Sequence, residues 1–545
     1  MRGTMMAYPL TLQHVFDHGT TLFPKQEIVT GSVSGAHRYT YREFGERVRR
    51  LAGALRSLGI RRGDRVASFA WNHSRHLELY FAVPLIGAVL HTVNIRLFPE
   101  DVAYIINHAG DRLIFADRSL LPTLRGLRGG LATVERVVSM DDGSDVDTSD
   151  AADYEDLLAR GGDDRPFIAS GEDDAAMLCY TSGTTGRPKG VLYSHRALVL
   201  HAFGACMVDS LALSHRDATM AIVPMFHVTA WGVPFACTLV GAKQVFPGVA
   251  PQPERYLALL QDERITFAAG VPTVWIALRP MIASGRYDLS SLQRVFIGGS
   301  AVPPGLIRAY DELGITIYHA WGMTETTPIG TVGRLKQDLD ALEGDERVAR
   351  RAKQGLPVPG VELRAVDAEG AEVPQDGRAM GDLLARGPWI AGSYFDNPEG
   401  AASWTDDGWF RTGDVVTIDE DGYVEIVDRT KDLIKSGGEW ISSVALENAL
   451  MAHPNVHEAA VIAMPDPTWI ERPMASVVPR PEARKNVGDA ELAEHLRPLF
   501  AKWWLPDRYV FLDEIPKTSV GKFDKKALRA RLQDGSLDRA GSSAP

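Results

Sequence analysis

Residues 180–190 read Tyr-Thr-Ser-Gly-Thr-Thr-Gly-Arg-Pro-Lys-Gly and carry the strongest pattern in the chain. This stretch holds three glycines, four aliphatic hydroxyl side chains and two cations. The more apolar residues 175–179 precede it, which predicts a loop after a buried strand. Glycines let backbone N–H groups converge on an anion, hydroxyls add donors, and Lys189 or Arg187 supplies positive charge. The stretch therefore predicts a phosphate-binding loop, although a Gly/Ser/Thr cluster taken alone is more often an ordinary surface loop. Its spacing is not that of a GxxxxGK[ST] loop, and a GxGxxG pattern is absent as well.

Length, charge and cysteine usage limit the kinds of protein that this chain can be. A chain of 545 residues is too long for one hydrophobic core and should form two or more domains. The net charge of −12, with no basic stripe to offset it, argues against a nucleic-acid partner. Cys179, Cys206 and Cys237 lie in apolar surroundings without CxxC spacing, so we interpret them as reduced core residues of a cytoplasmic protein. No signal-peptide pattern occurs in residues 1–20, and the longest apolar run, residues 79–90, is too short for a transmembrane segment.

Helical and strand patterns alternate along the first 430 residues, which predicts an α/β fold. A capping-box pattern at Thr40 and Glu43 introduces apolar residues at helical spacing that continue to Gly59. Further helices are expected at residues 77–90, 154–160, 253–263 and 304–313. Strands are expected at residues 65–70, 175–179, 219–223, 265–269, 292–297 and 315–318. Ligands of open α/β sheets bind beyond the carboxyl ends of strands, where the phosphate loop and three other motif-like segments fall.

Asp414 ends a turn-like segment, residues 407–414, in which a carboxylate is placed to accept both hydroxyls of a ribose.

The pattern of helices and strands changes after residue 429. Beyond the charge-rich residues 428–440, a small α+β unit is expected, with helices at 444–451 and 490–499 and strands at 459–464 and 475–478. The predicted fold is α/β, with a large N-terminal domain of layered sheets and helices over residues 1–429 and a small α+β C-terminal domain over residues 430–533. The Gly/Ser/Ala-rich residues 534–545 are expected to form a disordered tail.

Several segments together resemble the adenylate-forming superfamily, which includes acyl-CoA synthetases, peptide-synthetase adenylation domains and beetle luciferases. They are residues 180–190, Thr324-Glu325, RTGD at 411–414, DRTKDLIKSGG at 428–438 and PKTSVGK at 516–522. The likeness is strongest to bacterial medium- and long-chain fatty acyl-CoA synthetases, because of PMFHVTAW at 224–231 and DLIKSGGEWISS at 432–443. The resemblance implies an AMP-forming acyl-CoA synthetase with ATP and coenzyme A as cosubstrates and Mg²⁺ as cofactor.

The reaction that this resemblance implies has two steps. A carboxylate attacks the α-phosphate of ATP to give an acyl-adenylate and pyrophosphate, and the thiol of coenzyme A then displaces AMP. Because the first step brings an anion against a polyanion, it needs a metal ion and cationic side chains that stabilise the charge of the transition state.

Site residues carry over from the family position by position. The resemblance implies catalytic roles for Lys522, Glu325 and Thr181, with Thr181 and Glu325 near the magnesium ion. Contacts to ATP or the adenylate are implied for Thr181, Ser182, Gly183, Thr184, Thr185, Lys189, Gly299, Ser300, Ala301, His319, Ala320, Trp321, Gly322, Thr324, Asp414, Arg429, Lys435 and Trp440. Contacts to the acid are implied for His227, Trp231, Ala301 and Gly322. Without the motifs, Thr324 and Glu325 would suggest only an exposed polar pair, and Asp414 and Arg429 only a surface ion pair. Trp231 would suggest a packed core tryptophan, and Lys522 one of several lysines that aid solubility.

Lys431 matches the hinge of the family, about which a mobile small domain turns between an adenylating and a thiolating orientation. In the first orientation, Lys522 is implied to contact both the carboxylate and the α-phosphate, and in the second it leaves. Lysine suits this task because it carries a point charge on a flexible stem.

Three features of the sequence bear on the acid substrate. Amino-acid-activating relatives place an acidic residue early in the segment that matches residues 226–229, and none occurs here, which disfavours an amino acid. Residues 232–235 predict an apolar wall that suits an alkyl chain, although an aromatic or a short sulfur-containing acid fits it as well. Trp321 stands where many relatives have tyrosine, and its larger ring is able to reshape the acyl pocket.

We therefore expect a cytoplasmic fatty acid–CoA ligase, with a CoA ligase for an aromatic or short-chain acid as the first alternative. The second alternative is an adenylation enzyme that loads a carrier protein, although no carrier domain is evident after Lys526. A non-catalytic relative is disfavoured because the required motif positions are occupied, and a luciferase-like oxidation would need a special substrate. We expect a homodimer formed through the N-terminal portion, as in the relatives that the chain most resembles.

Overall fold

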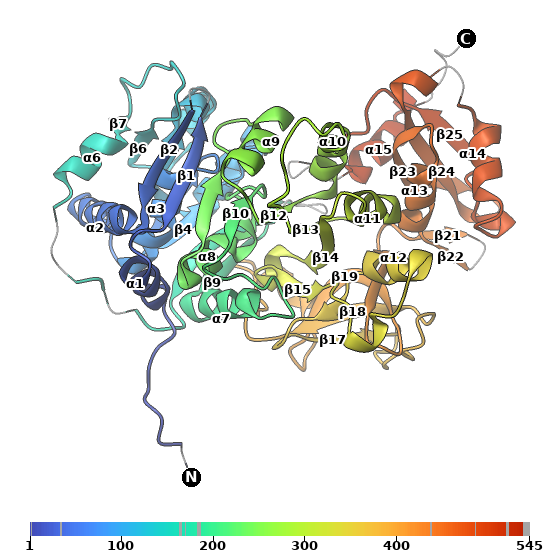
Figure 1. Ribbon diagram of the computed structural model, residues 1–545, viewed down its shortest axis with the longest axis horizontal. Coiled ribbons are helices and arrows are strands. Elements are labelled where there is room, and N and C mark those ends of the chain that lie inside the picture. The colour runs from blue at the N-terminus through green and yellow to red at the C-terminus, as the bar shows by residue number, and fades with distance from the viewer. Residues whose placement is uncertain are drawn as a thin grey trace.

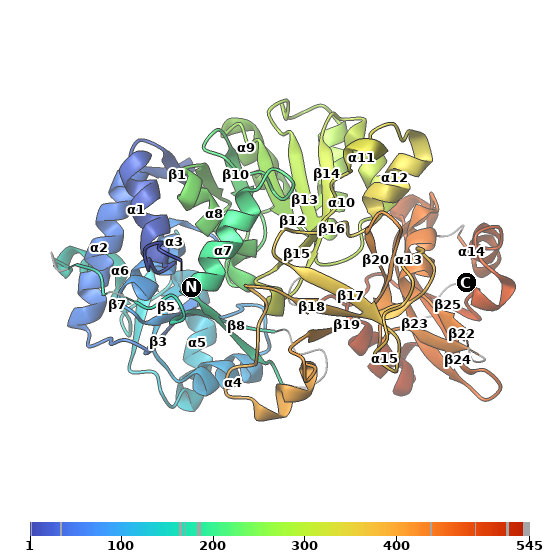
Figure 2. The same cartoon turned by 90° about the horizontal axis from the view of Figure 1, so that it is seen from below.

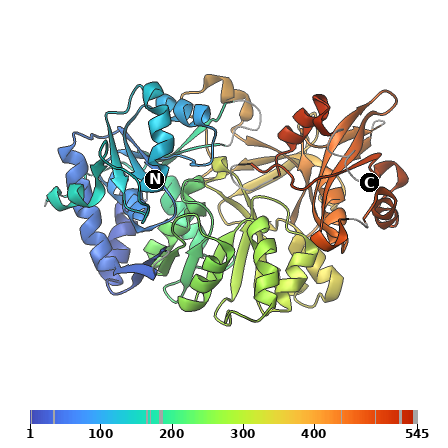
Figure 3. The same ribbon diagram turned by 90° about the horizontal axis from the view of Figure 1, so that it is seen from above.

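The computed structural model describes residues 1, 3–32, 35–162, 166–168, 170–181, 187–436, 439–484, 487–518 and 523–537. Along these residues the chain forms a large N-terminal part built on three sheets and a small C-terminal part built on a fourth (Figure 1). The α/β class and the division into a large and a small part, predicted above, are confirmed. Views from below and from above place the small part at one end of the long axis and the first helices at the other (Figures 2 and 3).

The first sheet contains the strands on either side of the predicted phosphate loop. Its order is β7-β6-β5-β3-β4-β8-β9, and the pairing is parallel except between β8 and β9. The bounds are β3 (Arg65–Phe69), β4 (Val89–Thr92), β5 (Asp111–Asp117), β6 (Arg136–Met140), β7 (Ala152–Asp153), β8 (Ala175–Tyr180) and β9 (Gly190–Ser194). The connection from β8 to β9 therefore follows a buried strand, as predicted.

The second sheet carries the other predicted site segments. Its order is β16-β15-β14-β13-β12-β10-β11-β1-β2, parallel from β14 to β1 and antiparallel at both edges. The bounds are β1 (Glu27–Ser32), β2 (Gly35–Thr40), β10 (Ala218–Ala221), β11 (Lys243–Phe246), β12 (Phe267–Gly270), β13 (Arg294–Gly298), β14 (Thr316–Gly322), β15 (Ile329–Val332) and β16 (Leu356–Pro357). The parallel strands β12, β13 and β14 end at one edge of the sheet, where a ligand site is expected.

Helices cover and separate these two sheets. Those of the N-terminal part are α1 (Leu12–Leu22), α2 (Tyr41–Ser57), α3 (Ser74–Leu85), α4 (Pro99–Ala109), α5 (Leu121–Leu127), α6 (Tyr154–Arg160), α7 (His195–Cys206), α8 (Val233–Val240), α9 (Pro253–Asp262), α10 (Pro272–Ala283), α11 (Pro304–Asp311) and α12 (Gly344–Ala352). Helices α1, α3, α7 and α8 lie together between the sheets (Figure 2). None of the helices in the described part of the chain combines the length and the apolar character that a bilayer crossing needs.

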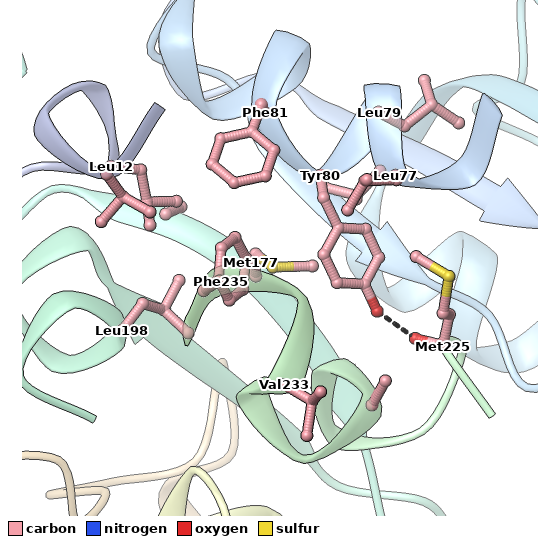
Figure 4. Packing of buried hydrophobic residues seen from close by; sticks show 14 of the residues in the cluster. Leu12, Leu77, Leu79, Tyr80, Phe81, Met177, Leu198, Met225, Val233 and Phe235 are labelled. Carbon is pink, nitrogen blue, oxygen red and sulfur yellow. Dashed lines mark hydrogen bonds between the residues drawn. The ribbon is translucent and has the colours of Figure 1, made fainter. Parts of the chain in front are cut away.

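The largest hydrophobic core lies among these central helices (Figure 4). Phe81 on α3 packs between Phe16 on α1 and Phe235 on α8, with ring centroids 5.8 Å and 5.5 Å away. Full burial of each such side chain stabilises the fold by roughly 1.5–3 kcal/mol. The hydroxyl of Tyr80 on α3 donates a hydrogen bond to the carbonyl of Met225, which ties the segment after β10 to this core.

The third sheet completes the N-terminal part, and the fourth forms the small C-terminal part. The third is β17 (Glu362–Val366), β18 (Gly381–Arg386), β19 (Phe410–Ile418) and β20 (Val424–Arg429), paired in that order. The fourth consists of β21 (Ile434–Ser436), β22 (Glu439–Ile441), β23 (Val456–Asp466), β24 (Ile470–Pro479) and β25 (Arg508–Phe511), with helices α13 (Ser443–Ala452), α14 (Asp489–Leu496) and α15 (Lys525–Gln533). Its core, which includes Leu446, Val461 and Leu492, is separate from the core of Figure 4.

The structure confirms some local predictions and corrects others. The capping box at Thr40 and Glu43 is present at the start of α2. The helix predicted for residues 77–90 ends at Leu85, because Gly87 turns the chain with a φ of 77° before β4 begins. Asp414 lies within β19 and not on a turn, since pairing with β18 and β20 overrides the local turn signal. The strand predicted for residues 315–318 continues to Gly322.

Candidate active site

Two adjoining cavities lie beyond the carboxyl ends of β13 and β14. The first, which we call the phosphate-loop cavity, has a volume of about 330 Å³ and is bounded by Thr181, Lys189 and Glu325 among others. The second, the interdomain cavity, has a volume of about 260 Å³ and extends from Asp414 to the small C-terminal part. The residues that line both include Gly299, Ala320, Trp321, Gly322, Arg429 and Lys431. The two cavities are therefore neighbouring compartments of one site.

The two ends of the phosphate loop are joined by hydrogen bonds. The N–H of Thr181 donates to the carbonyl of Lys189 at 2.9 Å, and the N–H of Lys189 donates to Oγ1 of Thr181 at 3.2 Å. These bonds continue the β8–β9 ladder and hold both residues at the cavity wall. The predicted phosphate contacts that lie outside the described residues are Ser182, Gly183, Thr184 and Thr185.

Glu325 is connected to the phosphate loop through Tyr394. The buried carboxylate of Glu325 accepts a hydrogen bond of 2.6 Å from the hydroxyl of Tyr394. The ring of Tyr394 faces the ammonium of Lys189, whose Nζ lies 4.7 Å from the ring centroid. Burial raises the pKa of Glu325, and the hydrogen bond from Tyr394 opposes that increase. Tyr394 was not predicted from the sequence, because the surrounding residues 392–397 carry no anion-binding pattern.

The residues at this wall fit a magnesium ion that arrives with a polyphosphate. Thr181 and Glu325 offer a hydroxyl and a carboxylate to the same cavity. Within the described ranges there is no group of three or more His, Cys, Asp or Glu residues that would hold a metal alone. Mg²⁺ is ordinarily bound through one or two carboxylates together with substrate phosphates and water, which matches this sparse donor set.

The apolar wall of the phosphate-loop cavity comes mainly from the segment after β10. Residues 228–231 adopt left-handed backbone with φ between 39° and 58°, which costs roughly 1–2 kcal/mol for each residue with a Cβ. This turn brings Trp231 against Gly298, where an added Cβ would lie 3.3 Å from the indole. Further apolar lining residues include Val223, Pro224, Val228 and Ile329. Of the predicted acid contacts, His227, Trp231 and Gly322 line this cavity, and Ala301 lines the interdomain cavity.

Asp414 and Arg429 face each other across β19 and β20 at the interdomain cavity. The Nε atom of Arg429 lies 3.5 Å from Oδ1 of Asp414, and the indole N–H of Trp321 donates to Oδ2 at 2.8 Å. Thr324, on the short turn after β14, lines the neighbouring phosphate-loop cavity. The predicted ribose pair therefore lies beside the predicted phosphate contacts.

His319 brings a neutral ring to the interdomain cavity, beside Gly299, Ser300 and Ala301. Its Nδ1 lies 2.7 Å from the carbonyl of Ala352. Burial lowers the pKa of His319 to about 4, so the imidazole carries no charge near neutral pH.

The small C-terminal part contributes charged residues to the interdomain cavity. Lys522 lies outside the described residues, but Thr518 and Phe523, which precede and follow the undescribed stretch, both line this cavity. The Nζ atom of Lys525 lies 2.6 Å from Oγ of Ser443 and 2.8 Å from Oε1 of Glu447. Lys431 lines both cavities, at the crossing from the third sheet to the fourth.

Two predicted contacts lie away from the cavities. Lys435 is on β21 and Trp440 on β22, and the Nζ atom of Lys435 lies 4.5 Å from the ring centroid of the exposed Trp440. Neither residue is among those that line the two cavities. The structure therefore does not bring this pair to the site in the present orientation of the small part.

Comparison with known proteins shows what the chain is similar to. The chain is 50% identical to the long-chain-fatty-acid–CoA ligase of Thermus thermophilus, over 98% of this chain and 97% of that protein. It is 44% identical to the 3-methylmercaptopropionyl-CoA ligase of Ruegeria pomeroyi, over 98% of this chain and 99% of that one. The crystal structure of the anthranilate CoA ligase AuaEII in complex with anthranoyl-AMP superposes with a TM-score of 0.87 at 27% identity, covering 98% of this chain and 100% of that one.

Family models match both parts of the molecule. Residues 16–395 match the model of the AMP-binding enzyme family, and residues 445–522 match the model of the AMP-binding enzyme C-terminal domain. These matches show that the chain belongs to the AMP-binding enzyme family.

Proposed function

We propose that this chain is an ATP-dependent fatty acid–CoA ligase for medium- or long-chain acids. It forms an acyl-adenylate and pyrophosphate, and then acyl-CoA and AMP. The observation that carries the proposal is the phosphate-loop cavity, in which the polar wall of Lys189, Tyr394 and Glu325 meets an apolar wall beside Trp231. Such a boundary suits a reaction between a polyphosphate and the head of an alkyl acid. The 50% identity to a relative named for long-chain fatty acids supports this substrate class.

The proposed roles follow the family resemblance and, for the described residues, their placement in the two cavities. Thr181, Lys189 and Thr324 bind the phosphates together with Ser182, Gly183, Thr184 and Thr185, and Asp414 and Arg429 bind the ribose. The adenine and the acyl-adenylate lie along Gly299, Ser300, Ala301, His319, Ala320, Trp321 and Gly322. Lys522 reaches the α-phosphate and the attacking carboxylate from the small domain and stabilises the charge that develops there. His227 and Trp231 contact the acid.

Magnesium is part of this proposal. Thr181 and Glu325 would hold Mg²⁺ at the polar wall of the phosphate-loop cavity. The ion, when bound, neutralises phosphate charge and supports the departure of pyrophosphate. Tyr394 keeps the Glu325 carboxylate oriented by its hydrogen bond.

The proposed domains are residues 1–429 and 430–533, with Lys431 as the hinge and residues 534–545 as a tail. In support, β20 ends at Arg429 and β21 begins at Ile434, so a rotation between them separates two sheets without breaking either. In a second orientation, Lys435 and Trp440 would approach the acyl-adenylate while Lys522 leaves. One site would then serve both half-reactions.

An assay of AMP release with ATP, Mg²⁺ and coenzyme A tests the proposed substrate. The acids are acetate, butyrate, octanoate, palmitate, benzoate, cinnamate, 3-methylmercaptopropionate and several amino acids. We expect the highest kcat/KM with octanoate or palmitate, because the wall beside Trp231 is apolar. Highest activity with an amino acid would contradict the assignment of this wall to an alkyl chain.

A second candidate, a CoA ligase for a short or an aromatic acid, is favoured by two observations. One is the 44% identity to a 3-methylmercaptopropionyl-CoA ligase, and the other is the structural match to an anthranilate CoA ligase. A preference for 3-methylmercaptopropionate or benzoate in the same assay would select this candidate. Pyrophosphate release that coenzyme A does not affect, with no acyl-CoA formed, would instead point to an enzyme that loads a carrier protein.

We also propose that the protein is a cytoplasmic homodimer formed through its N-terminal domain. The likeness to dimeric fatty acyl-CoA synthetases, described above, supports the homodimer. The free thiols of Cys179, Cys206 and Cys237 support the cytoplasm, where thiols are kept reduced. Light scattering in solution tests the assembly, and a mass equal to one chain across the concentration range would contradict it.

A further inference from the structure

The indole of Trp321 links the second sheet to the third through Asp414. Trp321 is on β14 and Asp414 is on β19, and the indole N–H donates to Oδ2 of Asp414 at 2.8 Å. Both residues are buried, with exposed fractions of 6% and 3%, and both line the interdomain cavity. A buried carboxylate at the wall of a nucleotide site is therefore held by a donor from a different sheet.

The two oxygens of Asp414 have different surroundings. Oδ2 receives the indole N–H, which can donate in only one direction because the ring is rigid. Among the described residues, the polar partner of Oδ1 is Nε of Arg429, a side chain that is 38% exposed. The distance of 3.5 Å is longer than an ordinary N–H···O bond. The indole thus sets the plane of the carboxylate, while Oδ1 is less firmly held.

The position of the indole is itself determined by packing. The ring lies in the core of the third sheet with Leu383, Val416 and Val424. On the other side it lies against Gly330, where an added Cβ would approach Cζ3 of the ring to 2.3 Å. Gly330 does not have a positive φ, so glycine is needed here for space and not for backbone conformation.

We infer that Trp321 is a positioning residue that orients Asp414 to accept hydrogen bonds from the vicinal hydroxyls of the nucleotide sugar, and that Gly330 provides the space for its ring. This inference rests on the proposed function, in which Asp414 binds the ribose. It makes a prediction that a merely structural role does not make. Loss of the indole N–H should weaken binding of a nucleotide that has both hydroxyls and spare one that lacks them.

Isothermal titration calorimetry of AMP and of 2′,3′-dideoxy-AMP tests the inference without any need for turnover. The variants are W321F and a protein with benzothienylalanine at position 321, in which sulfur replaces the N–H while the ring size is kept. Because a hydrogen bond to a charged group is at stake, we expect AMP to bind about tenfold more weakly to both variants. In the benzothienylalanine protein, which keeps the ring beside the proposed adenine position, the affinity for the dideoxy nucleotide should change less than about twofold.

The matched control is W389F. Trp389 is also buried, and its indole donates to the carbonyl of Ile329 at 3.0 Å, so its loss should affect the two nucleotides equally. Equal weakening of both nucleotides in the benzothienylalanine protein, or no weakening, would overturn the inference. If W321F does not fold, the benzothienylalanine protein decides the outcome, because it keeps the volume of the ring.

The experiment separates this inference from the proposed function. A wild-type protein that prefers AMP to the dideoxy nucleotide, but activates no acid in the assay described above, would contradict the proposed ligase and leave the role of Trp321 standing. A wild-type protein that binds both nucleotides equally would overturn the role of Trp321, whatever acids it activates.

Discussion

The hydroxyl of Tyr394 donates a 2.6 Å hydrogen bond to Oε1 of Glu325. From this contact we predict that Y394F raises the Mg²⁺ concentration needed for half-maximal pyrophosphate release by roughly tenfold, since a hydrogen bond to a charged group is lost. Burial raises the pKa of Glu325 and the hydrogen bond lowers it, so the variant should have a still higher pKa. As pH falls, Glu325 of the variant should therefore take up a proton, and release the metal, at a higher pH than Glu325 of the wild type. The activity of the variant should accordingly begin to fall at a higher pH.

The matched control for this prediction is Y193F. The hydroxyl of Tyr193 donates to the carbonyl of Thr324 at 2.7 Å, one residue away from Glu325, and so donates to a backbone carbonyl where Tyr394 donates to a carboxylate. We expect Y193F to lower stability by about 1 kcal/mol and to leave the Mg²⁺ dependence unchanged. An equal shift of that dependence in both variants would mean that Tyr394 acts only through packing.

We predict that K522A reduces pyrophosphate release by about 10²–10³-fold and largely spares the conversion of supplied acyl-adenylate to acyl-CoA. The reason is that the charge of Lys522 is proposed to act only where the α-phosphate is attacked, and loss of one such electrostatic contact has an effect of this size. The control is K517A, which removes a neighbouring lysine whose ammonium pairs with Glu458 at 2.8 Å. Equal losses in both half-reactions would remove the proposed role of Lys522.

Much of the fold and part of the site could be predicted from residues that act locally. Glycines and hydroxyls before Lys189 indicated a loop between strands, and the capping box at Thr40 and Glu43 indicated the start of α2. Both signals depend only on residues that lie within a few positions of one another, so they can be recognised in the sequence without the tertiary structure. Such signals also predict a change to the small part near Arg429, where β20 ends.

Contacts between distant segments could not be predicted in this way. The sequence places Tyr394 sixty-nine positions after Glu325 and Trp321 ninety-three positions before Asp414, and neither pair has a motif that joins it. Asp414 itself was expected on a turn, because its membership of β19 depends on pairing with β18 and β20. Tertiary pairing of this kind overrides local preference.

We predict that K431P slows the transfer of the acyl group to coenzyme A more than it slows adenylation. The factor by which the rate of transfer falls should be at least about ten times the factor for adenylation. Proline fixes φ near −65° and so restricts a rotation centred on this residue. Adenylation should be less affected, because in the present orientation Thr518 and Phe523 already line the interdomain cavity. K431A is the control, since it removes the charge without restricting the backbone, and single-turnover measurements of each half-reaction give the two rates. Equal slowing of both steps by K431P would exclude a hinge at this position.

The buried carboxylate of Glu447 accepts hydrogen bonds at Oε1 from Lys525 and from the N–H of Val461. Burial raises the pKa of Glu447 from its ordinary value of 4.5 to about 7. The folded state therefore binds this proton more tightly than the unfolded state, and the contribution of Glu447 to stability falls as pH rises from 4.5 through 7. The full change is about 3 kcal/mol, from 1.36 kcal/mol for each unit of pKa.

E447Q isolates this contribution, because the amide oxygen still accepts from Val461 while the titration is removed. The free energy of opening of β23, obtained from hydrogen exchange of residues 456–466 at pH 5 to pH 8 and corrected for intrinsic exchange, should fall with pH more steeply in the wild type than in E447Q. The difference between the two proteins cancels every other titrating group that they share. This difference in the free energy of opening should change by about 2–3 kcal/mol between pH 5 and pH 8. If the free energy of opening instead depends on pH equally in both proteins, the carboxylate of Glu447 is already ionised at pH 5 and Lys525 holds it charged.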